Sequence, residues 1–317
     1  MSTPPQITTP LTALTGIAHP IVQTALGWVS GPRLVSATAR AGALGILASA
    51  TMTFGELEAA ILAVRARTDQ PFGVNLRANA GDVMARAELL ITHRVTVASF
   101  ALAPSRELID LLKDGGVVVI PSIGSIRHAE KLQSWGADAV MLAGGEGGGH
   151  VGSIPTSLLL PSVTAAVEIP VVAAGGYFDG RGLAAALAYG AVGIGMGTRF
   201  LLTRESPVPR AVKERYLAAG LDGTVVTTKA DGKAYRLLRT EYVEGLDSSS
   251  IDPQELAVST PHRLRAGLVD GDAGAGVLAS GQVVGVIDDL PTVEELVDRI
   301  VREAVVRLRA AAATVIR

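Results

Sequence analysis

Short apolar runs recur along the first 200 residues, and longer segments with helical periodicity separate them. Each run is too short and too uniformly apolar for a half-exposed antiparallel strand, so each predicts a buried parallel strand. The eight runs are 19–23, 43–47, 72–76, 95–100, 117–121, 139–142, 170–174 and 192–196.

The segments between these runs carry signals for helix starts. Thr53 and Glu56 form a capping-box pattern before the apolar-periodic segment 57–64, and Ser105 and Ser125 stand at similar positions later. Eight alternating strand and helix units predict an α/β protein, a (β/α)₈ TIM barrel. Alternation alone does not prove closure, so an open doubly wound sheet is the alternative.

The alternation stops after Met196. Segment 211–219 predicts a helix, 220–264 is polar and predicts an irregular insertion, and 292–317 predicts one amphipathic helix. We therefore expect a barrel at 1–205, an insertion or lid on the substrate side at 206–266, and a C-terminal segment at 267–317. The apolar stripe of the last helix could pack on its own barrel or on a second subunit; it consists of Val293, Leu296, Val297, Ile300, Ala304, Val305 and Leu308.

Composition narrows the class of protein. Hydrophobic residues make up 48% and aromatic residues 4%, so the core is aliphatic, as suits buried parallel strands. The net charge is −2 and no basic block stands out, so we expect no nucleic-acid partner. The absence of cysteine excludes disulfides, thiolate catalysis and sulfur-ligated metal, and we expect no metal site.

Two further features bear on location. Residues 1–5 lack the charged start and apolar block of a signal peptide, and Asp179 and Arg181 interrupt the most apolar region, 171–196. We expect a cytoplasmic protein without a membrane span.

Three glycine clusters follow the last three predicted strands: 144–149, Gly175-Gly176, and 195–197. In a barrel the strand carboxyl ends form the active face, and the loops after the last strands commonly hold a phosphate. Backbone N–H groups in glycine turns suit such an anion, and Thr198 adds a hydroxyl. The alternative is that these glycines only make tight turns. The lone Gly195-Met196-Gly197 is weak evidence for a dinucleotide fold, because no opening βαβ unit accompanies it.

Histidine is the candidate for chemistry at this face. His150 ends the first glycine cluster and alone among the five histidines is expected at the carboxyl rim. His93 and His128 fall in predicted helices, His19 opens a strand at the other end, and His262 lies in the insertion without an assigned role. Glu146 either orients His150 or satisfies amide groups of the glycine loop.

The order of five motifs resembles that of the nitronate monooxygenase (2-nitropropane dioxygenase-like) family, which includes flavin-dependent enoyl-thioester reductases. The motifs lie at 19–23, 73–75, 148–152, 173–176 and 196–200. The resemblance covers about residues 10–205 and resumes at 281–285. It implies an FMN-containing TIM barrel in which His150 is the active-site histidine. By the same resemblance the FMN contacts are Ala25, Leu26, Asn75, Gly149, Gly175, Gly176, Gly197 and Thr198.

A closer resemblance within that family is to actinobacterial flavoproteins of steroid-ring degradation. It rests on segments 49–53, 98–104, 220–228, 238–241 and 266–271, while 241–266 is shorter than in such relatives. It implies α,β-desaturation of a cyclic acyl-CoA from the steroid C and D rings, as in cholesterol catabolism. FMN would accept the hydride, and His150 would be the base for the α-proton. Cations that could contact CoA phosphates are Arg77, Lys229, Lys233, Arg236 and Arg239.

One departure from the family separates the alternatives. Relatives often carry Gly-Gly-Met after the early glutamine, where this chain has Thr24-Ala25-Leu26, and this more crowded position argues against nitronate oxidation. The competing hypotheses are a nitronate monooxygenase, an NAD(P)H-dependent enoyl-thioester reductase, and a flavin-free phosphate-binding barrel.

Overall fold

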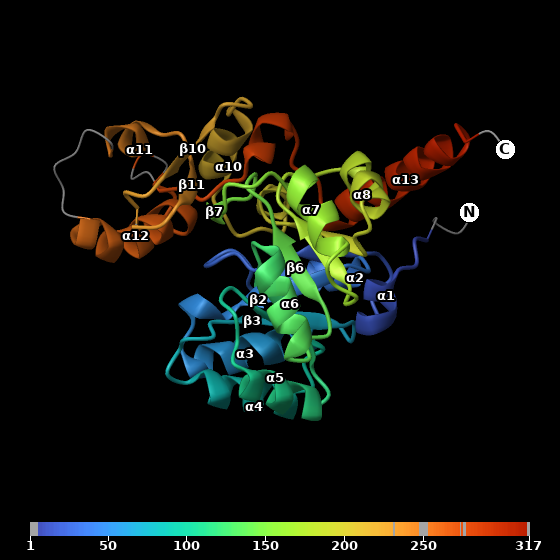
Figure 1. Ribbon diagram of the computed structural model, residues 1–317. Coiled ribbons are helices and arrows are strands. Elements are labelled where there is room, and N and C mark those ends of the chain that lie inside the picture. The colour runs from blue at the N-terminus through green and yellow to red at the C-terminus, as the bar shows by residue number, and fades with distance from the viewer. Residues whose placement is uncertain (1–5, 231, 247–252, 273, 275–276, 316–317) are drawn as a thin grey trace.

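Eight parallel strands close into a barrel, in the order β1-β2-β3-β4-β5-β6-β8-β9. The computed structural model describes residues 6–230, 232–246, 253–272, 274 and 277–315 (Figure 1). All eight predicted strands are confirmed, and the open sheet is excluded because β9 pairs with β1. The barrel strands are β1 (Ile21–Gln23), β2 (Leu44–Ala48), β3 (Phe72–Leu76), β4 (Val97–Phe100), β5 (Val118–Ile123), β6 (Val140–Ala143), β8 (Val171–Ala174) and β9 (Gly193–Met196).

Helices cover the outside of the barrel. The predicted capping box is present, because the Thr53 side chain accepts a hydrogen bond from Glu56 N and the Glu56 carboxylate accepts one from Thr53 N. Ser105 and Ser125 likewise cap the helices that follow them. The outer helices are α2 (Pro32–Arg40), α3 (Phe54–Arg65), α4 (Val83–Thr92), α5 (Arg106–Asp114), α6 (Ile126–Ser134), α7 (Thr156–Thr164) and α8 (Gly180–Ala188).

Aliphatic side chains fill the inside of the barrel. Leu11, from the short helix α1 (Pro10–Thr15), is fully buried and closes the amino end of the strands. Ile46, Val97, Ile120 and Val172 belong to the same buried cluster. The barrel interior is therefore a packed core, and any ligand site lies outside it at a rim.

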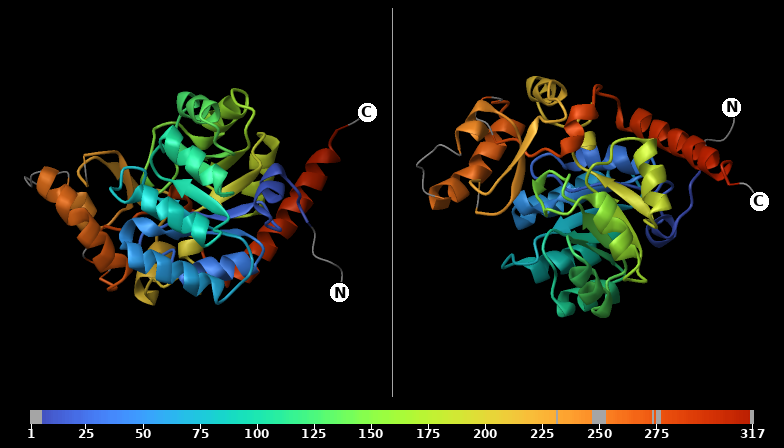
Figure 2. Two further views of the ribbon diagram at one scale, coloured as in Figure 1. Left: turned by 90° about the horizontal axis from the view of Figure 1, so that it is seen from below. Right: turned by 45° about the horizontal axis from the view of Figure 1, so that its top comes forward.

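The C-terminal helix packs on its own barrel, mainly on α8. Helix α13 (Val293–Ala312) buries the first five residues of the predicted stripe, while Val305 and Leu308 are half-buried. A Cβ on Gly180 would lie 2.4 Å from Ile300 O, so only glycine permits this approach of the two helices. Figures 1 and 2 show α13 and α1 on the side of the molecule away from the insertion.

The prediction of an irregular segment at 220–264 is wrong. After α9 (Thr198–Leu201) and the correctly predicted α10 (Arg210–Leu217), the segment forms a hairpin and two helices (orange in Figure 1). His262 lies in the second of these helices. The pattern failed because the hairpin strand β11 pairs with β7 (Gly149–His150), about 85 residues earlier, and local periodicity does not register such a partner. The elements are β10 (Thr224–Thr227), β11 (Tyr235–Leu238), α11 (Glu241–Gly245) and α12 (Pro253–Leu268).

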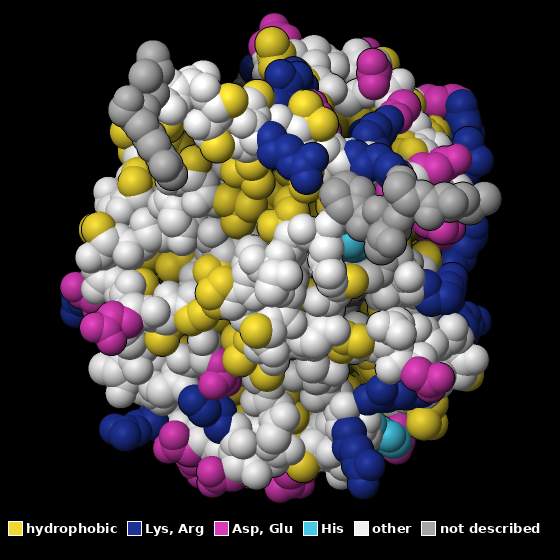
Figure 3. Space-filling view, turned by 90° about the vertical axis from the view of Figure 1, so that its right-hand side faces the viewer, with side chains coloured by type: hydrophobic (Ala, Val, Ile, Leu, Met, Phe, Trp, Pro, Cys, Tyr) yellow, Lys and Arg dark blue, Asp and Glu magenta, His cyan; other side chains and the backbone are white. Residues whose placement is uncertain are grey.

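The surface in Figure 3 mixes Lys and Arg with Asp and Glu, without a continuous field of one sign. Within the described ranges, no helix is long and apolar enough to cross a membrane. Residues 1–5, on which the signal-peptide prediction rests, lie outside those ranges, as do 247–252 of the segment predicted to be shortened.

Candidate functional site at the carboxyl rim

The three glycine clusters meet at one rim, because β6, β8 and β9 are neighbours in the barrel. Gly144 N donates to Ala174 O over 2.9 Å, which joins the first cluster to the end of β8. A Cβ on Gly175 would lie 3.1 Å from Gly144 O, and one on Gly176 would lie 3.5 Å from the Glu146 side chain. The loops after β6 and β8 are therefore in direct contact.

A segment from beyond the insertion ties the third cluster to the first. Gly281 N donates to Thr198 Oγ1 over 2.9 Å, and Gln282 N donates to Glu146 O over 3.0 Å. A Cβ on Gly148 would lie 2.6 Å from Gly281 N. The 3₁₀ helix η2 (Gln282–Val286) thus begins where the loops after β6 and β9 converge.

The backbone of this rim has the conformations that glycine alone adopts readily. Gly149, Gly175 and Gly176 have φ angles of +78°, +101° and +83°. Among the described residues, no acceptor is found for the N–H groups of Gly175, Gly176 or Gly197. Backbone N–H groups in such a turn can hold an anion such as a phosphate.

The first N–H groups of α8, which follows Gly175 and Gly176, are already bonded within the protein. Asp179 Oδ1 accepts from Gly182 N over 3.0 Å, and Glu303 Oε2 accepts from Gly180 N over 2.9 Å. Two carboxylates of the protein therefore already occupy N–H groups that a helix N-terminus offers to an anion.

The turn after β1 lies next to β9, and the buried side chain of Gln23 fixes it. Gln23 belongs to the sequence motif 19–23, but that motif alone indicated no role for it. Gln23 is fully buried, and its Nε2 donates to Ser30 Oγ over 2.8 Å. Ser30 Oγ in turn accepts from Leu26 N over 2.8 Å, which holds Ala25 and Leu26 in place. A Cβ on Gly197 would lie 3.1 Å from Leu26 Cδ2, so this turn closes on the loop after β9.

Asn75 lies at the end of β3, and β4 orients it. Its Nδ2 donates to Ser99 Oγ over 3.0 Å, in agreement with the register that pairs Asn75 with Ser99. The half-buried amide therefore has a fixed orientation at the same rim. A serine inside the buried run 95–100 was the sequence signal for this partner.

His150 lies on β7, the two-residue strand that follows the glycine loop. Its side chain is exposed, and its ring centroid lies 4.6 Å from that of Tyr235 at an interplanar angle of 71°. This edge-to-face contact comes from the insertion, which the sequence could not pair with the rim.

Glu146 serves the glycine loop. Its carboxylate accepts from Thr156 N over 2.9 Å and from Thr156 Oγ1 over 2.7 Å, which joins the loop to α7. Burial raises the pKa of the Tyr177 phenol, and the nearby Glu146 charge raises it further. These carboxylate contacts go to Thr156 at the start of α7, which is neither His150 nor an amide of the glycine cluster.

The five cations proposed for CoA differ in their surroundings. Arg236 donates to Gly145 O over 2.9 Å and to Thr224 Oγ1 over 3.0 Å, so its guanidinium holds the glycine loop. Burial lowers the pKa of Arg236, while Glu146 acts in the opposite direction. Arg239 pairs with Glu244 at 3.3 Å, and exposed Arg77 donates to Asn79. Lys229 is half-buried beyond β10, and Lys233 is exposed ahead of β11.

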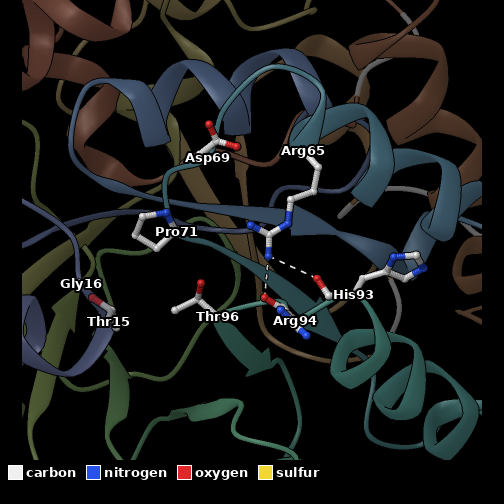
Figure 4. A pocket seen from close by; sticks show the side chains of 8 residues that line it. All are labelled: Thr15, Gly16, Arg65, Asp69, Pro71, His93, Arg94 and Thr96. Carbon is white, nitrogen blue, oxygen red and sulfur yellow. Dashed lines mark hydrogen bonds between the residues drawn. The ribbon is translucent and has the colours of Figure 1, made fainter.

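An open depression of about 560 Å³ lies at the opposite end of the barrel (Figure 4). Pro71 and Thr96, in its wall, precede β3 and β4, so it marks the amino ends of the strands. Arg65 donates there to the carbonyl oxygens of His93 and Arg94, and His93 lies 3.1 Å from Glu58. These contacts close the end of α4, and the depression is separate from the glycine rim.

The fold and this rim define a (β/α)₈-barrel protein whose glycine loops converge at the carboxyl ends of the strands. The family model described as nitronate monooxygenase matches residues 8–303, and the chain belongs to that family of flavin-dependent oxidoreductases.

Curated relatives cover nearly the whole chain. Two proteins named as the (3aS,4S,5R,7aS)-5-hydroxy-7a-methyl-1-oxo-octahydro-1H-indene-4-carboxyl-CoA dehydrogenase are similar to it. The one from Mycobacterium tuberculosis is 56% identical and covers 98% of this chain and 99% of its own. The one from Rhodococcus jostii is 55% identical and covers 95% and 97%.

Solved structures agree on the fold. FabK from Thermotoga maritima superposes with a TM-score of 0.93 at 35% identity, covering 98% of this chain and 100% of its own. A nitroalkane oxidase from Streptomyces ansochromogenes gives a TM-score of 0.83 at 31% identity, covering 96% and 100%.

Proposed function

We propose that this protein is an FMN-dependent dehydrogenase that introduces an α,β double bond into a cyclic acyl-CoA of steroid C/D-ring degradation. The observation that carries the proposal is the identity of 55–56%, over nearly the full length, with two proteins named for an indene-carboxyl-CoA. Convergence of the three glycine clusters beside a histidine supports it, because that rim offers an anion site and a base together.

The residues at the rim fit a bound FMN. The N–H groups of Gly175, Gly176 and Gly197 have no acceptor among the described residues, and Thr198 adds a hydroxyl beside them, which suits the FMN phosphate. Gln23 Oε1 is buried at the same rim, with no donor found in the described ranges. Asn75 would donate to the flavin, and the backbone of Ala25, Leu26 and Gly149 would border it.

FMN, when bound, supplies the acceptor for the hydride that leaves the β-carbon of the substrate. The imidazole of His150 takes the α-proton, and the electron pair of that C–H bond becomes the new C=C bond. General-base catalysis of this kind contributes about 10²- to 10⁴-fold. Arg77, Lys229, Arg236 and Arg239 are the cations we assign to the CoA phosphates, although Arg236 also holds Gly145 O, Arg239 pairs with Glu244 and Arg77 donates to Asn79.

A first prediction tests the base. His150→Ala should retain FMN, because none of the proposed phosphate or ring contacts is its side chain, and turnover should fall by about 10²- to 10⁴-fold. Flavin absorbance per polypeptide and the rate with the indene-carboxyl-CoA measure the two effects. Loss of flavin with unchanged turnover per bound flavin would reject the role.

Nitronate oxidation is the competing function, favoured by the family model itself. It requires oxygen consumption with alkyl nitronates and no flavin reduction by the acyl-CoA. The turn Thr24-Ala25-Leu26, where relatives often carry Gly-Gly-Met, argues against it.

A further inference from the structure

We propose that Tyr235, from the insertion, is the residue that positions the imidazole of His150. This inference rests on the proposed role of His150 as the base. The two residues are direct cross-strand partners, because β11 pairs antiparallel with β7 in the register Tyr235↔His150 and Arg236↔Gly149. Cross-strand partners on one face bring their side chains into contact.

The contact between the rings is specific. The centroids lie 4.6 Å apart and the planes meet at 71°, within the edge-to-face range in which aromatic pairs attract. Tyr235 is only 9% exposed, whereas the His150 side chain is exposed. The buried Tyr235 ring, which has few rotamers, therefore restricts rotation of the exposed His150 ring.

The residues on either side of Tyr235 form hydrogen bonds with the glycine loop and with the residue after His150. Val151 N donates to Ala234 O over 3.1 Å, and Arg236 donates to Gly145 O over 2.9 Å. Three consecutive residues of the insertion, 234–236, thus contact the chain before His150, at His150 and after His150.

Both edges of β11 are occupied. On the edge that pairs with β7, Leu238 N donates to Leu278 O over 2.8 Å, and on the other edge β10 pairs with all four residues of β11. Tyr235 accordingly sits in a strand with neighbours on both edges, which makes it a rigid support. The insertion therefore helps to position the proposed base, in addition to any role as a lid over the substrate.

The test compares Tyr235→Phe, which keeps the ring, with Tyr235→Leu, which removes it, in the FMN-loaded full-length protein. With the indene-carboxyl-CoA as substrate, Y235L should lower kcat by about 10- to 100-fold, as expected for a misplaced catalytic group. KM and flavin content should stay within about twofold, and Y235F should stay within about threefold of the wild type. Val226→Ala, at an exposed position on the partner strand β10, is the matched control and should leave kcat unchanged.

A second readout does not depend on catalysis. The His150 C–H signals, assigned with His150→Gln in a heteronuclear NMR spectrum of the five histidines, should carry a ring-current shift that Y235F keeps and Y235L loses. Tyr235→Met supplies another ring-free variant should Y235L not fold. Unchanged kcat in the ring-free variant, or an unchanged His150 shift, would overturn the inference, and so would a loss in Y235F equal to that in Y235L. If His150→Ala kept full turnover, the base assignment would fail instead, and the NMR shift would still decide whether Tyr235 orients the ring.

Discussion

Gly175 combines a φ of +101° with the close approach of another backbone, since its Cβ position lies 3.1 Å from Gly144 O and from Thr156 Oγ1. Gly116 has a φ of +76°, yet its Cβ position has nothing within 4 Å. A side chain at Gly116 would therefore lower stability only through its left-handed backbone. A side chain at Gly175 would lower stability through its backbone and also through steric overlap at the rim.

A second prediction follows from that difference. Gly116→Ala should lower the free energy of unfolding by about 1 kcal/mol, whereas Gly175→Ala should lower it by about 2–4 kcal/mol. Gly175→Ala should also lose FMN, because the rim would have to shift. Chemical denaturation and flavin retention after gel filtration measure both effects; equal stability and flavin retention in the two variants would contradict this view of the rim.

Lys213 of α10 is a buried cation. It is 6% exposed, and its Nζ donates to Thr203 O over 2.7 Å and to Ser206 O over 2.9 Å. Burial lowers the pKa of Lys213 to about 8, and the charges of Arg33 and Arg210 act in the same direction. Between this value and its ordinary pKa, the unfolded chain binds a proton that the folded chain does not, so stability rises with pH across that interval.

The third prediction uses Lys213→Met to isolate this effect. From pH 8 to pH 9.5, the free energy of unfolding of the wild type should rise relative to K213M by roughly 1–2 kcal/mol. Urea denaturation at several pH values provides the comparison. A constant difference between the two proteins would show that the lysine is charged in both states throughout.

At the scale of elements, one buried guanidinium connects α9, which follows β9, to α13. Arg199 is 2% exposed and donates to Asp289 Oδ1 over 2.8 Å and to the carbonyl oxygens of Leu202 and Asp289. Asp289 in turn accepts from Arg299 of α13 over 2.7 Å. Burial opposes ionisation of Asp289, but hydrogen bonds from Arg299 and Arg199 dominate and lower its pKa.

As a fourth prediction, Arg199→Met should cost about 2–4 kcal/mol of unfolding free energy, because buried acceptors lose their donor. Arg302→Ala, which removes an exposed pair with Asp298 on α13, should cost at most about 0.5 kcal/mol. R199M should also retain less FMN, since Arg199 directly follows Thr198. Thermal melting of the two variants, with flavin release as a second signal, tests this prediction. Equal melting temperatures of R199M and R302A would refute it.

The same scale shows what the sequence could and could not predict. Buried strands such as 72–76 were identified because both faces are apolar, and the Thr53–Glu56 capping box because its spacing is local. The strand 235–238 was missed because its partners are Gly149 and His150, far away in the chain. The bond from Arg236 to Gly145 O was not predicted, because the sequence shows a cation but not its partner 91 residues away.

At the scale of the molecule, closure of the barrel brings together glycine clusters from three separate loops. The sequence predicted this convergence from strand order, because neighbouring parallel strands end at one rim. It did not predict that 277–287 would return to the rim, where Gly281 meets Thr198, since no periodic element marks that segment. The roles assigned to FMN contacts and to CoA-binding cations stay predictions, as does the division at residues 205 and 266.

The most direct test of the central claim, a flavin dehydrogenase of a cyclic acyl-CoA, is an anaerobic titration of the FMN-loaded protein. The indene-carboxyl-CoA is added stepwise while the oxidised flavin absorbance is followed, and the products are analysed for an α,β-unsaturated thioester. The account predicts bleaching of the flavin together with one unsaturated product per flavin reduced. A flavin that stays oxidised with this thioester but is reduced by an alkyl nitronate, or a protein that takes up no FMN, would contradict it.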